Sequence, residues 1–245
     1  MTKKRDHLKH FPYKHPTFGT KNRPNPKAAW ESSVYYWWWA YLKRNTAYLD
    51  CCANAGQGEL ASIYADFGDV RGDSFKDWWM DARRGVRLFA EPVADDTVRI
   101  LAEGESALSL EQTLTVSVPL YLPKRFIERR FRELLTEHHL GERGRQLAKQ
   151  SRAKYKFQGQ PNLQGLKVTL AVYDFRQANP EMKLWEIGDR IPFLLGDKSP
   201  PWKITPTQDK VVRASLAATV SRYLKRAKEA IEFTSVGVFP RNADN

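Results

Sequence analysis

The sequence lacks long apolar runs and has little cysteine. No apolar stretch approaches the ~20 residues that span a bilayer, and none follows the basic start Met1–Arg5, so we expect neither a membrane segment nor a secretory signal. The two cysteines, Cys51 and Cys52, are adjacent, and a disulfide between neighbours is strained. We therefore expect both to be buried, reduced thiols in a cytoplasmic protein.

Motifs for metal or cofactor binding are also missing. There is no Cys-x-x-Cys pair and no cluster of cysteine and histidine at zinc spacing. Asp73, Asp77 and Asp81 would share one face of a helix, where carboxylates can hold a divalent metal. We favour a structural interpretation, with Asp73 as the N-cap and Asp77 in the positively polarised first turn. The sequence thus predicts no catalysis, no bound metal and no cofactor.

What the chain does have is positive charge. Its 40 basic and 28 acidic side chains give a net charge of +12, which attracts polyanions, and nucleic acid is the commonest polyanion in a cell. The net charge is +6 over residues 1–60, +7 over 124–156 and +3 over 209–245, but −5 over 61–112. We expect the basic segments to meet nucleic acid. The acidic block at 61–112 faces elsewhere and is where a protein partner could bind.

The first part of the chain predicts an arm and then helices. Residues 1–27 hold four prolines, many basic residues and few apolar ones, which is typical of a flexible arm. Apolar residues then recur at helical spacing over 29–55. This stretch contains the aromatic run Tyr35–Trp39, which we assign to the core, with Trp39 at a surface.

A change of period predicts strands before the middle of the chain. From Leu114 to Leu122 apolar and polar residues alternate, as in a half-buried strand, and Pro119 indicates an edge position. Together with the short apolar stretches at 86–89 and 98–101 we expect a small antiparallel sheet of about three strands.

The middle of the chain predicts a helix followed by a basic segment. Residues 123–139 carry an apolar stripe formed by Ile127, Phe131, Leu134 and Leu135. The residues after it mix cations, which neutralise phosphate, with aromatic side chains, which can stack on bases. The candidate nucleic-acid contacts here are Arg145, Lys149, Arg152, Lys154 and Lys156.

The last eighty residues predict three helices and a strand. Helices are expected from about Leu163 to Asn179, from Leu184 to Pro192, and from Asp209 onward, with a short strand at Val236–Pro240. This order of elements resembles that of a winged helix-turn-helix, although the connector before the last helix is longer than a tight turn.

The long last helix supplies the second set of candidate contacts. At about 100° per residue, one narrow stripe beside its apolar face gathers hydroxyl and guanidinium groups, which can bond bases or phosphates. The residues are Ser215, Thr219, Arg222 and Arg226, with Lys225 just past them.

The predicted fold class is α+β, with a helical N-terminal region, a small antiparallel sheet and a C-terminal winged-helix-turn-helix-like domain. The expected division is a basic arm at 1–27, a helical region with the sheet at 28–140, a basic linker at 141–162 and the helix-turn-helix-like domain at 163–245.

The predicted function is binding of nucleic acid, with duplex DNA favoured, as in a regulator or recruiting factor of a mobile element or phage-related system. Two alternatives stay open. One is an RNA-binding subunit of a ribonucleoprotein, which the aromatic content of 12% and the basic segment in the middle of the chain would suit. The other is a metal-dependent nucleic-acid enzyme, whose crowded candidates are Asp66, Asp69 and Asp73.

Overall fold

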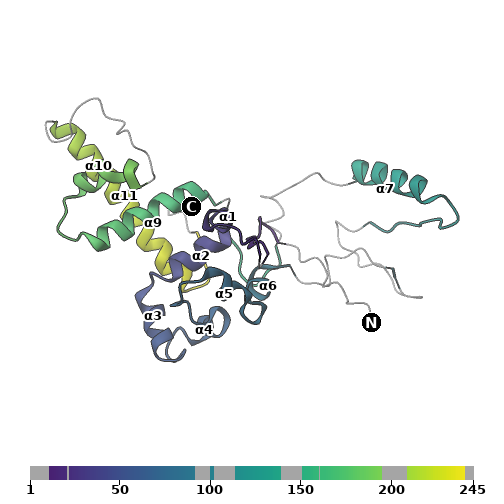
Figure 1. The fold of residues 1–245 in the computed structure, drawn as a ribbon, viewed down its shortest axis with the longest axis horizontal. Helices are drawn as coiled ribbons and strands as arrows, with labels where there is room; N and C mark the ends of the chain where they lie inside the picture. Colours follow the sequence, from purple (N-terminus) through teal and green to yellow (C-terminus); the bar gives the residue numbers. More distant parts are fainter. Residues whose placement is uncertain are drawn as a thin grey trace.

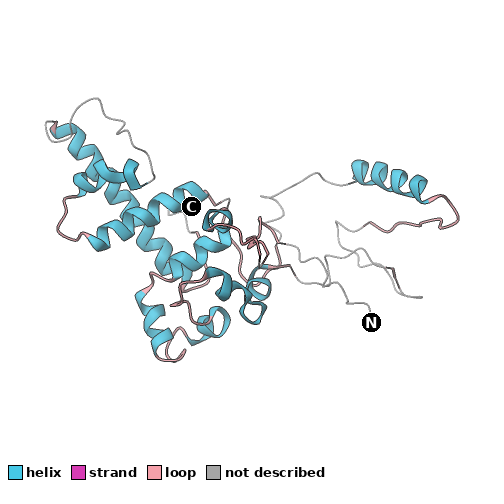
Figure 2. Ribbon diagram, viewed as in Figure 1, coloured by secondary structure: helices cyan, strands magenta, loops and turns pink. Residues whose placement is uncertain are grey.

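The computed structural model describes residues 11–20, 22–91, 100–101, 114–138, 151–159, 161–194 and 209–240. Within these ranges the chain is helical, and Figure 2 shows no strand in them. In chain order (Figure 1), the elements are α1 (Lys27–Glu31), α2 (Val34–Leu42), α3 (Thr46–Ala53), α4 (Ala61–Phe67), α5 (Phe75–Met80), the 3₁₀ turn η1 (Asp81–Arg83), α6 (Arg84–Phe89), α7 (Lys124–His138), α9 (Leu163–Ala178), α10 (Leu184–Leu194) and α11 (Lys210–Thr234).

Helix α2 lies at the centre of the molecule. All nine of its residues are buried, so apolar and aromatic side chains leave it in every direction. A helix that is hydrophobic all round is stable only when other elements surround it. Three consecutive tryptophans therefore need not share a face. The expected surface position of Trp39 is wrong, because only 5% of this residue is exposed.

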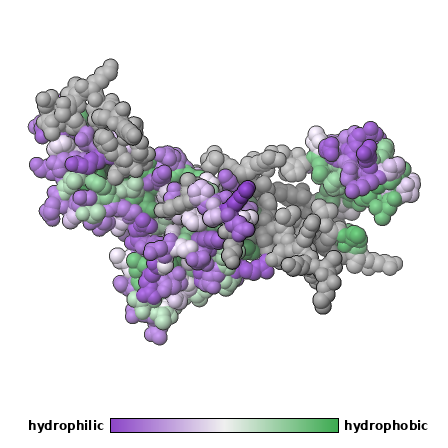
Figure 3. Space-filling model, in the orientation of Figure 1, coloured by the Kyte–Doolittle hydropathy of each residue, from purple (hydrophilic) through white to green (hydrophobic). Residues whose placement is uncertain are grey.

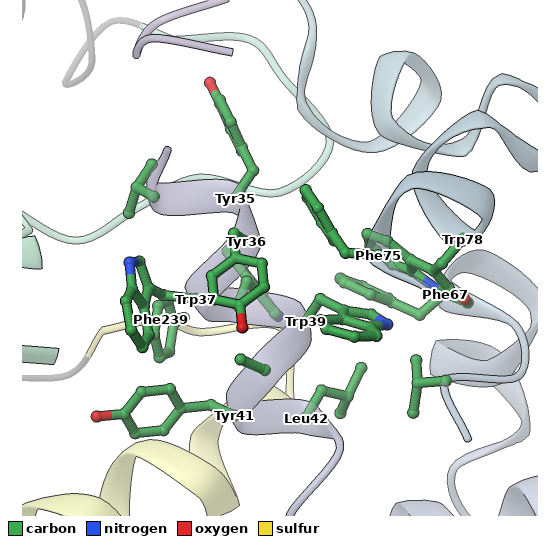
Figure 4. Close-up of a cluster of buried hydrophobic side chains, with 14 of the residues drawn as sticks. Tyr35, Tyr36, Trp37, Trp39, Tyr41, Leu42, Phe67, Phe75, Trp78 and Phe239 are labelled. Atoms are coloured by element: carbon green, nitrogen blue, oxygen red, sulfur yellow. Dashed lines mark hydrogen bonds between the residues drawn. The ribbon is translucent and has the colours of Figure 1, made fainter. Parts of the chain in front are cut away.

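Aromatic rings contributed by distant segments pack around α2 (Figure 4). The ring of Trp39 lies 5.5 Å from that of Phe75, in α5, and Tyr41 points to the other side, 5.2 Å from Phe239. Trp38 is fully buried and lies 5.1 Å from Phe157. Such tilted and edge-to-face pairs add to the stabilisation that burial of the rings itself provides.

A second, smaller core joins the three C-terminal helices. Val168 and Val172 of α9, Ile187 of α10 and Val220 of α11 are buried together. Both α9 and α11 also contribute residues to the aromatic core, through Leu166, Leu170, Ala230 and Ile231. These two long helices therefore connect the cores physically.

The aromatic core includes residues from segments expected to lie outside folded domains. Phe157, within the expected linker 141–162, is buried. Phe11 and Phe18, within the expected arm 1–27, pack against the same core, and the hydroxyl of Tyr13 donates to the backbone oxygen of Gly159 at 2.7 Å. Residues 1–10 and 141–150 lie outside the described residues.

The expected antiparallel sheet is wrong, and so is the α+β class. Residues 84–89 form α6, and residues 100–101 and 114–119 form no strand. Leu120 and Tyr121 lie in a turn and are 85% and 87% exposed. Alternation places apolar side chains on one face, but a strand also needs a neighbour to bond its backbone groups. No described residue supplies one; residues 98 and 99 lie outside the described part.

The wing of the expected helix-turn-helix domain is also absent from the described residues. Residues 235–237 form a turn, and Phe239 makes a single parallel bridge with Phe157. Its ring is fully buried in the aromatic core. Burial of a large aromatic side chain contributes more here than an isolated hairpin would, so the segment fills the core.

Local details refine two further expectations. The N-cap of α5 is Ser74, whose Oγ accepts from the amide of Asp77 at 3.2 Å, so the assignment of that role to Asp73 is wrong. Cys51 and Cys52 are buried and unbridged, as expected. Burial raises the pKa of the Cys52 thiol, which favours its protonated form.

Candidate nucleic-acid interface

Helix α11 is held in place by its N-cap and by a close contact with α10. The carboxylate of Asp209 accepts from the amides of Val211 and Val212 at 2.8 and 3.2 Å. On the buried side, a Cβ at Gly188 of α10 would lie 2.9 Å from the Cβ of Leu216, so only glycine permits this approach. The apolar face is thereby fixed inward, which turns the neighbouring stripe of α11 outward.

The α11 stripe consists of Ser215, Thr219, Arg222 and Arg226. The serine and both arginines are exposed, while Thr219 is half-buried. An Nη2 of Arg222 donates to Oγ1 of Thr219 at 3.3 Å, which aligns the guanidinium along the helix. The structure therefore brings four of the five predicted α11 residues into one continuous surface.

A hollow of about 240 Å³ lies on this stripe. Its described lining residues are Thr219, Arg222, Tyr223 and Arg226. Three of them were predicted as contacts. Tyr223 was not among the predicted contacts; it packs against the C-terminal core and also lines the hollow. Its position at the boundary of the apolar face was the signal that could have identified it.

The cations of α11 differ in their acidic neighbours. Lys225, the fifth predicted residue, lies 3.9 Å from a carboxylate oxygen of Glu229. Within the described residues, neither Arg222 nor Arg226 has a carboxylate at ion-pair distance. The two arginines therefore keep most of their planar donor groups available for phosphate or guanine.

The second predicted set, on the basic segment after α7, is arranged differently. Lys154 forms an ion pair with Asp66 of α4 at 2.6 Å, and the hydroxyl of Tyr155 donates to the other oxygen of that carboxylate at 2.7 Å. The backbone amide of Arg152 donates to Glu91 at 2.7 Å. These three bonds attach the segment to α4 and to Glu91, so the groups that form them are already engaged within the protein. Lys156 is exposed, and Arg145 and Lys149 lie outside the described residues.

The Asp66 cluster is electrostatically stable. Partial burial opposes ionisation of the carboxyl, but the hydrogen bonds from Lys154 and Tyr155 prevail and lower the pKa of Asp66. Burial, reinforced by the hydrogen bond to Asp66, raises the pKa of Tyr155 above its ordinary value. At neutral pH a carboxylate therefore accepts from both a cation and a phenol.

The carboxylates considered for a metal-dependent enzyme each have their own partner. Asp66 binds Lys154, Asp69 binds Arg71 at 2.6 Å, and Asp73 lies 3.2 Å from Lys43. Among the described residues no three side chains of metal-ligating type converge on one point. The structure does not assemble these three aspartates into a site.

The chain was compared with family models, curated proteins and solved structures, and none of these comparisons found a match. Among the described helices, none combines the length and the apolar composition that a membrane crossing requires.

Proposed function

We propose that the protein binds nucleic acid through the α11 stripe, with duplex DNA as its ligand. The observation that carries the proposal is the hollow on α11, where two arginines without acidic partners among the described residues adjoin a threonine and a tyrosine. Arginine bonds guanine or phosphate through two parallel donors, and hydroxyl groups bond phosphate oxygens. Helix α11 carries six basic and two acidic side chains, so the surrounding field also favours a polyanion.

The contacts made by Lys154 favour α11 over the basic segment at 151–157. A cation that already holds a carboxylate at 2.6 Å must give up that partner before it can neutralise phosphate. Among the described residues, Arg222 and Arg226 have no carboxylate partner to give up.

The location of the aromatic side chains favours duplex DNA over single-stranded RNA. Stacking on unpaired bases requires exposed rings. The run Tyr35–Trp39 is buried throughout, so these five aromatic side chains serve the core and cannot stack on bases. A single basic helix with a narrow polar stripe has the dimensions that fit the major groove of DNA.

The test replaces both stripe arginines and compares the variant with a charge-matched control. Arg222→Ala with Arg226→Ala should weaken binding to duplex DNA at least about tenfold, because each base-reading arginine contributes about 1–3 kcal/mol. Fluorescence anisotropy with labelled duplexes gives the affinity, and circular dichroism checks the fold. The control is Lys210→Ala with Lys228→Ala, which removes the same charge from exposed positions about 140° round the same helix.

The control variant distinguishes the loss of specific contacts at the α11 stripe from the loss of net positive charge. We expect it to retain most of the affinity. Equal losses in the two double variants would mean that binding follows net charge alone and would contradict the stripe. A folded arginine variant that binds as well as the parent would exclude α11 as the contact element. A structured RNA of the same length should bind more weakly than duplex DNA; the opposite order would favour the ribonucleoprotein alternative.

A further inference from the structure

Helix α7 stands apart from the other labelled helices in Figure 1. None of its fifteen residues is buried, although it is strongly amphipathic. Figure 3 shows hydrophobic residues gathered on one side of this part of the molecule and hydrophilic residues on the other. A helix of this length is marginal in water unless its apolar face is covered.

The apolar face of α7 has the spacing of a helix–helix seam. Ile127, Phe131 and Leu134 follow one another at steps of four and three, and His138 continues the pattern. We call these four residues the α7 stripe. Leu135, beside the stripe, is 40% exposed. The seam is about three turns long and narrow, which suits one partner helix.

The polar side of α7 argues against an anionic membrane as that partner. Ion pairs within the helix join Lys124 to Glu128 at 3.7 Å and Arg130 to Glu133 at 2.9 Å, and Arg129 lies 3.9 Å from Glu133. Helices that lie on anionic membranes instead present a polar face rich in uncompensated Lys and Arg. A partner of mixed charge fits this helix better.

We propose that the α7 stripe pairs with the same stripe of a second copy of this chain, with the two helices antiparallel. In that register Phe131 packs against the partner's Leu134, and Leu134 against the partner's Phe131. In the two outer layers Ile127 packs against the partner's His138, and His138 against the partner's Ile127. A twofold axis makes every contact occur twice, as in most homodimers.

Charge selects the antiparallel orientation. Arg130 and Glu137 flank the stripe on the same side, one turn on each side of its middle. In the antiparallel pair Arg130, which also binds Glu133 of its own helix at 2.9 Å, faces the partner's Glu137, and the twofold axis repeats the interaction. A parallel pair in register would place Lys124 against the partner's Lys124 at the seam, where like charges oppose each other.

Two large apolar residues just before α7 are also exposed. Leu120 and Tyr121, 85% and 87% exposed, precede the first turn. Even so, the interface is short, so the dimer is weak and depends on protein concentration. This inference does not rest on the proposed function, because it is tested without nucleic acid.

The experiment is sedimentation equilibrium of the full chain over a range of concentrations. The mass should rise from the 28.3 kDa of the monomer towards twice that value. Phe131→Glu should lower the association constant at least about tenfold, because it places a charge in the central layer. Arg130→Glu alone and Glu137→Arg alone should each weaken association. The combined swap Arg130→Glu with Glu137→Arg should restore it, because opposite charges face each other again.

The control is Arg125→Glu, a charge reversal on the opposite side of α7, which should leave association unchanged. Because no residue of α7 is buried, these variants should keep the melting temperature of the parent, and that measurement confirms that the body is folded. The proposal is overturned if the chain stays monomeric at every concentration, or if dimers persist in Phe131→Glu. It is equally overturned if the charge swap fails to restore association, or if the parent binds anionic vesicles through Phe131 while remaining monomeric.

Discussion

At the scale of single residues, Asp66 shows that an ion-pair partner distant in sequence decides whether a lysine is available to bind phosphate. The sequence places Lys154 in a dense basic run, which predicts a phosphate contact. In the structure its ammonium group contacts a carboxylate that lies 88 residues earlier in the chain. Arg222 and Arg226 also have basic neighbours in sequence but acquire no such partner within the described residues. Helical spacing in the sequence predicts that Arg222 and Arg226 share one stripe of a helix. No local sequence pattern could predict the ion pair between Lys154 and Asp66.

We predict that Asp66→Asn destabilises the fold by about 1 kcal/mol, since a hydrogen-bonded ion pair is lost but Lys154 is more than half exposed. The effect should depend on pH. The folded-state pKa of Asp66 is lowered, so its contribution is complete above the ordinary aspartate pKa and disappears as the pH falls through the folded-state value. Urea denaturation of parent and variant, at neutral pH and at successively lower pH, measures this difference.

The matched control is Asp50→Asn, which neutralises an exposed aspartate in α3. It should leave the free energy of unfolding nearly unchanged at every pH. If Asp66→Asn is as stable as this control at neutral pH, the cluster with Lys154 and Tyr155 does not attach the segment 151–159 to α4.

At the scale of elements, the helices could be predicted and the strands could not. The spacing of apolar residues identified the segments that form α9, α10 and α11. The last helix was expected from Asp209 onward, and in the structure Asp209 is its N-cap. Helical hydrogen bonds are local, so a periodic segment contains most of what it needs. The alternation over 114–122 was equally clear, but a strand depends on a neighbour that no local pattern guarantees. The same limit applies to Val236–Pro240, where Phe239 enters the core.

Helix α11 offers a test of how the two cores are coupled. Val220 is fully buried in the C-terminal core, so Val220→Ala should lower the free energy of unfolding by about 2 kcal/mol, through lost transfer energy and a cavity. Val211→Ala, at a 77% exposed position of the same helix, should have almost no effect. Thermal melting followed by circular dichroism measures both.

Tryptophan fluorescence, compared with the helical circular dichroism signal, shows whether the two cores unfold together. Five of the tryptophans, at positions 37, 38, 39, 78 and 79, are buried in the aromatic core, away from Val220. Because α9 and α11 contribute to both cores, Val220→Ala should lower the fluorescence midpoint together with the helical signal. Two separate transitions, with the fluorescence midpoint unmoved, would show that the C-terminal helices unfold independently, as the sequence-based division at residue 163 implies.

At the scale of the whole molecule, net charge predicts the class of ligand but not the place where it binds. A surplus of twelve positive charges attracts any polyanion. The described structure narrows the choice of site, because ion pairs engage Lys154, Lys225 and several cations of α7, while Arg222 and Arg226 have none among the described residues. Composition could not have shown this distribution, since it arises from which acidic side chains the fold brings close.

This distribution leads to a prediction about salt. Binding to duplex DNA releases about 0.9 counterions per phosphate neutralised, and we expect a slope of about −4 or steeper in a plot of log affinity against log salt concentration. Titrations of labelled duplex at several potassium chloride concentrations give the slope.

The double variant distinguishes two kinds of arginine contact. If Arg222 and Arg226 both contact phosphate, replacing them should make this slope shallower by about two, and binding to all sequences should weaken alike. If they read bases, affinity should fall with little change of slope, and the loss should depend on sequence. Lys210→Ala with Lys228→Ala should change neither the slope nor the sequence preference. A nearly flat dependence for the parent would rule out phosphate neutralisation and, with it, the binding of nucleic acid proposed for this surface.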